Sequence, residues 1–317
     1  MPWLVPAKSS LRGNCTAIDE AISGILLLLH EITTQPTAAR NDDVAGTSHG
    51  YYTQQEVKMK DKVAVITGST SGIGLEIAKH FAKLESKIVI NGFAKETEVA
   101  RILAELKELG ASSVFYQGIN LAEPEEIFSM FERIIKEFGK IDILVNNAGI
   151  QHVAPIDEFP EDKWEQILRI DLIASFYTTK YAIPIMKKNG FGRIVNIASA
   201  HAYVASPFKS AYVAAKHGIL GLTKTVALEV AENNITVNAI CPGYVNTPLV
   251  QNQIADTAKA RHISEESALR DVILKSQATK KFVEADEIAN LVIFLCDEKA
   301  SSITGSGLLI DGGWTAQ

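Results

Sequence analysis

The sequence of 317 residues has little cysteine, no long apolar run and no excess of basic residues. Its three cysteines, Cys15, Cys241 and Cys296, lack the spacing of metal-binding or paired thiols, which indicates free thiols in a reducing compartment and no metal. The apolar run Ile22–Leu29 is shorter than the about 20 residues that a membrane-spanning helix needs. The formal net charge of -6 gives no electrostatic support for binding nucleic acid. We therefore expect a cytoplasmic protein that binds neither membranes nor nucleic acid.

The first 58 residues differ in character from the rest. Proline and glycine are scattered among polar residues there, and Asp19, Glu20 and Glu31 flank the apolar run. Acidic residues at those positions argue against a secretory signal or an organelle transit peptide. We expect residues 1–58 to be an extension, disordered or of non-native origin, and residues 59–317 to form a domain that folds without it.

From residue 59 onward, short apolar runs alternate with segments of helical spacing. The runs are Val63–Thr67, Lys87–Asn91, Val114–Gln117, Ile141–Asn146, Arg193–Ser199, Thr236–Ile240 and Gly307–Ile310. Apolar runs without alternation suit parallel strands that are covered on both faces. One long helix is expected from about Asp162 to Met186. The pattern predicts a single α/β domain with a doubly wound parallel sheet of about seven strands and helices on both faces.

A glycine-rich turn joins the first predicted strand to the helix that follows it. Its glycines are Gly68, Gly72 and Gly74. Glycines let the backbone approach a pyrophosphate and direct amide N–H groups and a helix N-terminus at it. Their spacing, Gly-x-x-x-Gly-x-Gly, differs from Gly-x-Gly-x-x-Gly, and such a turn alone can be merely a tight loop. Its position between a strand and a helix favours dinucleotide binding.

A tyrosine and a lysine stand one helical turn apart after Ser210. If this segment is helical, Tyr212 and Lys216 share a face, and a nearby cation lowers the pKa of a phenol toward that of a usable base. Taken alone, such a pair is more often a half-buried ring beside a solvated cation. Ser199, taken alone, is equally well explained as a strand-end or capping hydroxyl. What favours catalysis is that these motifs fall at strand ends, where ligands bind in doubly wound sheets.

Five motifs in order resemble the short-chain dehydrogenase/reductase family over residues 60–317. They are Thr67-Gly68-x-x-x-Gly72-Ile73-Gly74, Asn146-Asn147-Ala148-Gly149, Ser199, Tyr212-x-x-x-Lys216 and Pro242-Gly243. The resemblance implies a Rossmann-type fold, a nicotinamide cofactor and a homotetramer. It also implies that Tyr212 is the acid and base, that Lys216 lowers the pKa of Tyr212 and binds the nicotinamide ribose, and that Ser199 hydrogen-bonds the reacting oxygen. The residues expected to bind the cofactor are Gly68, Thr70, Ser71, Gly72, Ile73, Gly74, Phe93, Asn120, Leu121, Asn147, Ala148, Gly149, Tyr212, Lys216, Pro242, Gly243 and Val245.

One catalytic position departs from the family, which usually has an asparagine where this chain has Asp171. The asparagine supports a water in a proton relay. If a backbone carbonyl holds that water, the aspartate is tolerated, whereas if the amide matters, activity falls or its pH profile shifts. We expect Asp171→Asn to leave turnover unchanged or to raise it.

The charges near the predicted adenine site favour NAD over NADP. A 2′-phosphate needs Arg or Lys near the end of the second strand or in the glycine turn. Neither Ser69–Ser71 nor Asn91–Phe93 supplies one, although Lys95 is near. The aspartate that often marks NAD use is also absent, and the residue close to that position is Asn91.

Polar residues surround the predicted catalytic groups, among them Gln151, His201, Lys209 and Gln253. Amide, imidazole and ammonium groups around one point suit a small carboxylate, although each residue has an alternative role at the surface or in a loop. The local sequences resemble bacterial-type D-3-hydroxybutyrate dehydrogenases, in which the matching residues bind the substrate carboxylate. The resemblance implies oxidation of (R)-3-hydroxybutyrate by NAD, with Trp314 and a lid at about residues 246–280 around the methyl end.

Two other functions remain open at this point. An NADPH-dependent acyl-carrier-protein ketoreductase would need a basic site for the 2′-phosphate and a basic surface for the carrier, and neither is evident. A weakly catalytic NAD-binding assembly protein is favoured only by Asp171. Tyr244 stands where the hydroxybutyrate enzymes often have tryptophan, which changes the shape of the pocket.

Overall fold

A computed structural model of the chain describes residues 58–316, without the side chains at positions 248, 249, 252, 253, 256, 260 and 261. The predicted extension, apart from Lys58, lies outside the described residues. No helix in the described part of the chain is both long and apolar enough to cross a membrane.

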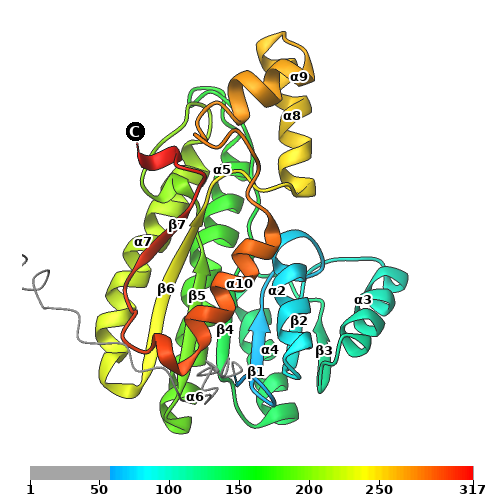
Figure 1. Ribbon diagram of the computed structural model, residues 1–317, viewed down its shortest axis with the longest axis vertical. Coiled ribbons are helices and arrows are strands. Elements are labelled where there is room, and N and C mark those ends of the chain that lie inside the picture. The colour runs from blue at the N-terminus through cyan, green and yellow to red at the C-terminus, as the bar shows by residue number, and fades with distance from the viewer. Residues whose placement is uncertain (1–57, 317) are drawn as a thin grey trace, which may run out of the picture. The chain divides into compact units, whose positions relative to one another are not determined.

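Seven parallel strands form one sheet in the order β3-β2-β1-β4-β5-β6-β7 (Figure 1). The strands are β1 (Val63–Ile66), β2 (Lys87–Asn91), β3 (Ser113–Gln117), β4 (Ile143–Asn146), β5 (Gly192–Ile197), β6 (Ile235–Pro242) and β7 (Gly307–Ile310). The order reverses between β1 and β4, which makes a topological switch point at the carboxyl ends of these strands. The predicted doubly wound sheet is confirmed, and no strand bound differs from the expected one by more than two residues.

Helices cover both faces of the sheet. On one face lie α2 (Gly72–Lys83), α3 (Glu96–Glu108) and α10 (Ala285–Cys296), and on the other lie α4 (Pro124–Phe138), α6 (Ala174–Asn189) and α7 (Ser210–Val230). Strand β1 shows the division, because Ala64 and Ile66 pack against α2 while Val63 and Val65 pack toward α4. All residues of β1, β4, β5 and β6 are buried, as continuous apolar runs predict.

The remaining elements are α5 (Glu161–Leu168), α8 (Pro248–Arg261), α9 (Glu265–Ser267), two π-helical segments, η1 (Arg169–Ile173) and η4 (Ala268–Ile273), and the 3₁₀ turns η2 (Ala200–Ala202), η3 (Ala231–Asn233), η5 (Glu298–Ala300) and η6 (Trp314–Ala316). Helices α8 and α9 lie beyond the carboxyl ends of the strands (Figure 1), in the segment predicted to be a lid. That this segment moves stays a prediction.

The expected helix from Asp162 to Met186 is interrupted. It runs as α5, η1 and α6 from Glu161 to Asn189, and the middle five residues are π-helical. A π-helical turn inside an α-helix alters which residues face the sheet, and such turns are frequent at functional sites. The turn holds Asp171, which is buried.

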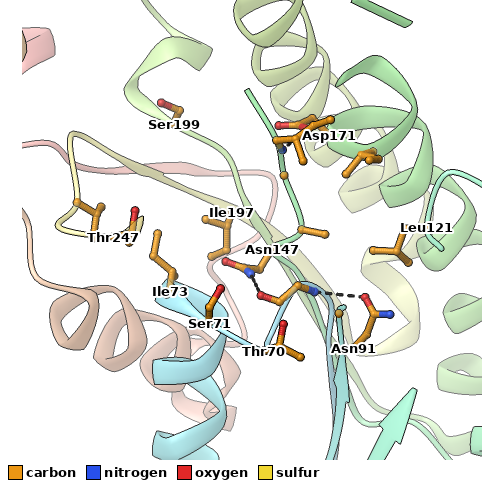
Figure 2. Close-up of a pocket in the computed structure, with 18 of the residues that line it drawn as sticks. Thr70, Ser71, Ile73, Asn91, Leu121, Asn147, Asp171, Ile197, Ser199 and Thr247 are labelled. Carbon is orange, nitrogen blue, oxygen red and sulfur yellow. Dashed lines mark hydrogen bonds between the residues drawn. The ribbon is translucent and has the colours of Figure 1, made fainter. Parts of the chain in front are cut away.

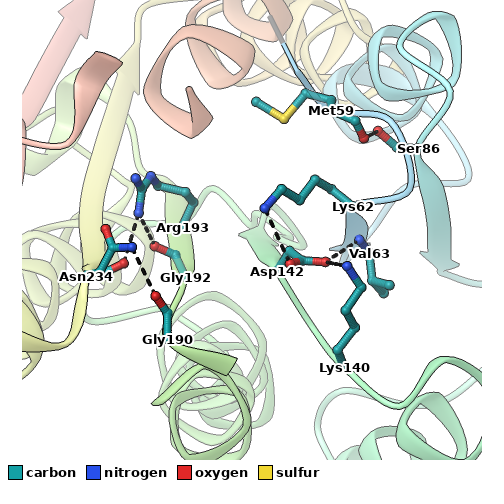
Figure 3. A network of polar contacts seen from close by, with 10 residues as sticks. All are labelled: Met59, Lys62, Val63, Ser86, Lys140, Asp142, Gly190, Gly192, Arg193 and Asn234. Atoms are coloured by element: carbon teal, nitrogen blue, oxygen red, sulfur yellow. Dashed lines mark hydrogen bonds and ion pairs between the residues drawn. The ribbon is translucent and has the colours of Figure 1, made fainter. Parts of the chain in front are cut away.

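Polar contacts fasten the strands at their amino ends (Figure 3). Asp142 Oδ2, just before β4, accepts a hydrogen bond from the Val63 N–H at 2.8 Å and lies 2.8 Å from Lys140 Nζ. The buried Arg193 donates from Nη1 to the carbonyls of Gly192 and Asn234, which joins β5 to β6. These contacts join neighbouring strands at the edge of the sheet opposite the carboxyl ends.

Candidate active site

A cavity of about 410 Å³ opens at the carboxyl ends of the strands. Segments that follow β1, β2, β3, β4, β5 and β6 line it, as expected for a site at the switch point. Of the residues expected to bind a cofactor, all but Gly74 line this cavity. The cavity is also lined by residues that were not expected to bind the cofactor, which are Asn91, Gly92, Ile119, Ile150, Ile170, Ile197, Ala198, Thr247 and Val250.

Two asparagines hold the glycine turn in place (Figure 2). Asn147 Nδ2 donates to the carbonyls of Thr67 and Gly68, both at 2.9 Å, and Asn91 Oδ1 accepts a hydrogen bond from the Gly68 N–H at 3.3 Å. Asn91 Nδ2 also donates to the carbonyls of Gln117 and Ile119. The sequence pointed to Asn91 only for its lack of charge, because these contacts lie outside its own strand.

The glycine turn fits a phosphate group. Gly68 has φ +62°, and a Cβ there would lie 2.7 Å from Ala148 Cα. A Cβ at Gly74 would collide with the Gly68 carbonyl and the Asn147 amide, so Gly74 is needed for packing rather than for lining the cavity. Ser71 precedes α2 without capping it through its side chain, which leaves the first N–H groups of the helix open to an anion.

Ser199, Tyr212 and Lys216 all line the same cavity. Ser199 follows β5, and the other two lie one turn apart on α7. Lys216 Nζ is 5.3 Å from the centre of the Tyr212 ring and donates a hydrogen bond to the Ile197 carbonyl at 3.2 Å. A phenol, a hydroxyl and an ammonium thus line one wall of the cavity. Groups of these types can transfer a proton to or from the oxygen of a bound molecule.

The pKa of Tyr212 is shifted by several groups that act in opposite directions. Burial raises it above its ordinary value, Lys216 lowers it, Asp171 raises it, and a hydrogen bond with Ser199 lowers it. Lys216 lowers the pKa of Tyr212, as expected, but burial and the Asp171 carboxylate outweigh the ammonium, so the net shift is upward.

Asp171 lies beside Lys216 with its side chain fully buried. Oδ1 accepts a hydrogen bond from the Ile150 N–H at 2.8 Å, and Oδ2 lies 3.4 Å from Lys216 Nζ. Burial raises the pKa of Asp171 to about 6, although Lys216 and the Ile150 N–H act to lower it. The pKa of Lys216 is lowered by burial but raised more by Asp171 and Tyr212 together, so its ammonium is kept.

His201 contacts Ser199 rather than solvent. Its Nδ1 lies 3.3 Å from Ser199 Oγ, and its Nε2 lies 2.9 Å from Ser206 Oγ. Its ring meets Tyr212 edge-on at 5.8 Å and Trp314 edge-on at 4.9 Å. Burial, and then Lys209, lower the pKa of His201 to about 3, so it is a neutral hydrogen-bonding group at physiological pH.

Lys209 supplies a buried ammonium. Its Nζ donates to the Tyr244 hydroxyl at 3.2 Å, and burial lowers its pKa to about 8. The Tyr244 ring stacks on Trp314 at 5.2 Å with an angle of 6° between the rings. A second cavity of about 390 Å³ is bounded by Lys209, Tyr244, the loop around Phe208 and the segment around Ile273.

The structure thus brings His201, Lys209 and Trp314 into one linked group next to Ser199 and Tyr212. Gln151 is partly buried and follows Ile150, which lines the first cavity. Gln253 lies on α8, but its side chain is outside the described part of the chain. Tyr244, which the sequence marked only for its shape, takes part through both its ring and its hydroxyl.

Away from the cavity, Glu76, His80 and Asp286 bring ligand atoms within 4.8 Å of one another. His80 Nε2 and Asp286 Oδ1 are 3.0 Å apart, and Asp286 is 62% exposed. The contact joins α2 to α10 as a polar pair at the surface, and the expectation of no metal stays a prediction.

Comparisons with known proteins agree with this geometry. The family described as short chain dehydrogenase matches residues 62–258. A D-beta-hydroxybutyrate dehydrogenase of Rhizobium meliloti is 54% identical over 81% of this chain and 99% of the relative, and one of Cupriavidus necator is 47% identical over 82% and 100%. The crystal structure of an actinorhodin polyketide ketoreductase with NADPH is 32% identical, with a TM-score of 0.76 over 81% of this chain and 98% of that chain. The chain therefore belongs to the short-chain dehydrogenase family.

Proposed function

We propose that the protein oxidises (R)-3-hydroxybutyrate to acetoacetate, reversibly, with NAD as the hydride acceptor. The observation that carries the proposal is the buried Lys209 ammonium, which is linked through Tyr244 and Trp314 to His201 beside Ser199. A buried cation beside an alcohol-oxidising centre suits a small substrate that has a hydroxyl at one end and a carboxylate at the other. The identities of 54% and 47% to two D-beta-hydroxybutyrate dehydrogenases support the same substrate.

Proton transfer in this proposal belongs to Tyr212. In the oxidation, Tyr212 takes the proton of the substrate hydroxyl, while Ser199 hydrogen-bonds the same oxygen and stabilises the charge that develops there. The nicotinamide cofactor, which the glycine turn and Lys216 would hold, supplies the hydride acceptor and, when oxidised, a positive charge that lowers the pKa of Tyr212. In the reduction, Tyr212 returns its proton to the ketone oxygen.

Substrate recognition belongs to Lys209 and its neighbours. The ammonium pairs with the substrate carboxylate, and neutral His201 offers hydrogen bonding without adding charge. The apolar ring of Trp314 covers the methyl end, and the Tyr244 ring stacks on Trp314 and fixes its orientation. Gln151 and Gln253 complete the carboxylate site in this proposal.

NAD is favoured over NADP by the charges that line the first cavity. Among the lining residues, all of them in the described part of the chain, Lys216 alone carries a cationic side chain, and it belongs to the catalytic group. The residues at the end of β2, Asn91 to Phe93, offer no cation for a 2′-phosphate. The side chain of Asn91 already accepts a hydrogen bond from the Gly68 N–H of the glycine turn.

A homotetramer in the cytoplasm is part of the same proposal. Large apolar side chains are exposed at Phe128 on α4, Phe176 on α6 and Leu228 on α7, the last to 83%. These three helices cover the same face of the sheet, and exposed apolar side chains are what an interaction surface would use. Sedimentation equilibrium would test the assembly, and a monomer at micromolar concentration would contradict it.

The experiment that tests the function is an assay of cofactor reduction with a panel of substrates. The panel contains both enantiomers of 3-hydroxybutyrate, other short hydroxy acids and uncharged secondary alcohols, each with NAD and with NADP. We expect the highest kcat/KM for (R)-3-hydroxybutyrate with NAD. A preference for uncharged alcohols would overturn the substrate, a preference for NADP(H) with carrier-bound ketones would favour a ketoreductase, and no turnover would favour a binding protein.

A further inference from the structure

Asp171 combines two contacts that an amide cannot make at once. A carboxylate has two acceptor oxygens, whereas the single oxygen of an asparagine amide leaves its NH₂ group to face the second donor. Here one oxygen accepts from the Ile150 N–H, and the other faces the Lys216 ammonium. We infer that Asp171 is a positioning residue that ties Lys216 to the loop after β4, and that its charge sets the pH range in which Tyr212 acts as a base. The inference rests on the proposed function in so far as Tyr212 is the base.

The geometry of the bridge depends on the backbone around it. Oδ2 has no hydrogen-bond partner within the described residues, so its contact is the ion pair with Lys216 at 3.4 Å. A Cβ at Gly149 would lie 2.9 Å from Oδ2, so a side chain there would displace the carboxylate. Lys216 also donates to the Ile197 carbonyl, which means that it stays held at the end of β5 when the carboxylate is replaced.

Among the titratable groups around Tyr212, Asp171 and Lys216 are the charged ones at neutral pH. Within the described residues, four titratable groups face Tyr212. Lys216 lies on the same helix and Asp171 on the π-helical segment. His201 lies on the turn after β5 and Cys241 on β6. Burial, and then Lys209, lower the pKa of His201 to about 3, and burial raises that of Cys241 to about 11, so both are neutral between those values.

The direction of the effect follows from the charge alone. Tyr212 and Lys216 share their protons as a coupled pair, so the alkaline deprotonation belongs to the pair. Whichever of the two loses the proton, a negative charge at Asp171 opposes the loss. Replacing Asp171 by neutral asparagine therefore lowers the pH at which the pair deprotonates.

The first test compares pH profiles of kcat/KM for 3-hydroxybutyrate oxidation. We expect Asp171→Asn to shift the rising limb to lower pH by roughly one unit, so that kcat/KM at a fixed pH on that limb rises. Asp162→Asn, a change of an exposed aspartate on α5, is the matched control for net charge and should leave the limb in place. A limb that does not move, or that moves to higher pH, overturns the charge role.

A second measurement does not depend on the substrate. Ultraviolet difference titration of tyrosine ionisation, with and without Tyr212→Phe, isolates the phenol of Tyr212. We expect its ionisation at lower pH in Asp171→Asn than in the wild-type protein. If 3-hydroxybutyrate is not oxidised while this shift is found, the proposed function fails and the inference stands.

The bridging role needs a different pair of variants. Asparagine at 171 can still accept from the Ile150 N–H, whereas Asp171→Ala leaves this N–H without its partner. Because Gly149 and Ile150 line the cofactor cavity, we expect Asp171→Ala to weaken cofactor binding by roughly tenfold and Asp171→Asn to leave it nearly unchanged. Equal dissociation constants for wild-type and alanine proteins, by fluorescence titration, would overturn the bridge.

Discussion

Lys209 and Tyr244 form a close pair, in which Nζ donates to the tyrosine hydroxyl at 3.2 Å and lies 5.1 Å from the centre of the ring. The ammonium is thus held by a hydrogen bond and by the face of an aromatic ring, although its residue is only 9% exposed. The ring in turn is fixed by its stacking on Trp314. A cation ordered in this way loses little conformational entropy when it pairs with a ligand.

The role of Lys209 predicts a difference between charged and uncharged substrates. We expect Lys209→Met to raise KM for 3-hydroxybutyrate by roughly 10- to 100-fold, because a charge-assisted hydrogen bond is worth about 1.5–3 kcal/mol. KM for an uncharged secondary alcohol should change little. Lys224→Met, at an exposed position on α7, serves as the control. Equal effects of Lys209→Met on both substrates in steady-state assays would remove the carboxylate role.

The pKa of Lys209 predicts a dependence of KM on pH. Burial lowers it to about 8, so the ammonium is complete well below that pH and is lost as the pH rises through it. We expect KM for 3-hydroxybutyrate to rise above about pH 8, while KM for an uncharged alcohol stays level. Lys209→Arg should remove the rise, because arginine stays protonated. A rise that persists in this variant would point to another group.

The role of Tyr212 predicts a loss of turnover without a loss of binding. Tyr212→Phe removes the proton acceptor but keeps the ring, so we expect kcat to fall by roughly 10²- to 10⁴-fold. The dissociation constant of the cofactor, measured by fluorescence, should stay within about a factor of a few. Tyr203→Phe is the control, because that hydroxyl donates to the Gly307 carbonyl instead. If Tyr212→Phe retains most of its activity, a different base must be sought.

The exposed Phe93 predicts how cofactor preference can be changed. It lines the cavity after β2 and is 72% exposed. We expect Phe93→Arg to raise the ratio of kcat/KM with NADP to that with NAD by roughly tenfold, because the guanidinium can pair with a 2′-phosphate. Phe93→Gln introduces a polar side chain without charge and should leave the ratio unchanged. An arginine variant with an unaltered ratio would show that the adenine ribose lies elsewhere.

The domain boundary gives a prediction about stability. Met59 is 2% exposed, its carbonyl accepts a hydrogen bond from Ser86, and Asp61 N–H donates to the Glu85 carbonyl. We expect residues 59–317 to be soluble and as active as the full chain. Met59→Ala in the full chain should lower the free energy of unfolding by about 2–5 kcal/mol in urea titrations. Insoluble or inactive protein from 59–317 would give the extension a structural role.

The strands and the glycine turn could be predicted because each is encoded by neighbouring residues. Val63–Ile66 is a continuous apolar run, and the glycines after it supply positive φ where the chain turns. The long helix was predicted as uninterrupted, because the π-helical Arg169–Ile173 has no local signature that separates it from an α-helix. Its position depends on contacts with the sheet rather than on its own residues.

Much of the site depends on contacts between residues far apart in the chain. The stacking of Tyr244 on Trp314 and the hydrogen bond from Lys209 to Tyr244 have no sequence signal, because each partner is separated from the other by many residues. The net pKa of Tyr212 could not be predicted either, since the spacing to Lys216 says nothing about burial or about Asp171. The residues that the family resemblance assigned to cofactor binding all line one cavity except Gly74, and the structure adds the relations among them.

The hydrogen bonds from Asn147 to Thr67 and Gly68 join residues about 80 positions apart. A chain is synthesised from its amino end, so the glycine turn emerges from the ribosome long before the asparagine that fixes it. During that interval β1 has β2 beside it but lacks β4, its other neighbour in the sheet. Until Asn147 is available, the glycine turn lacks these two hydrogen bonds and one edge of β1 is unpaired, which leaves that edge open to pairing with other chains.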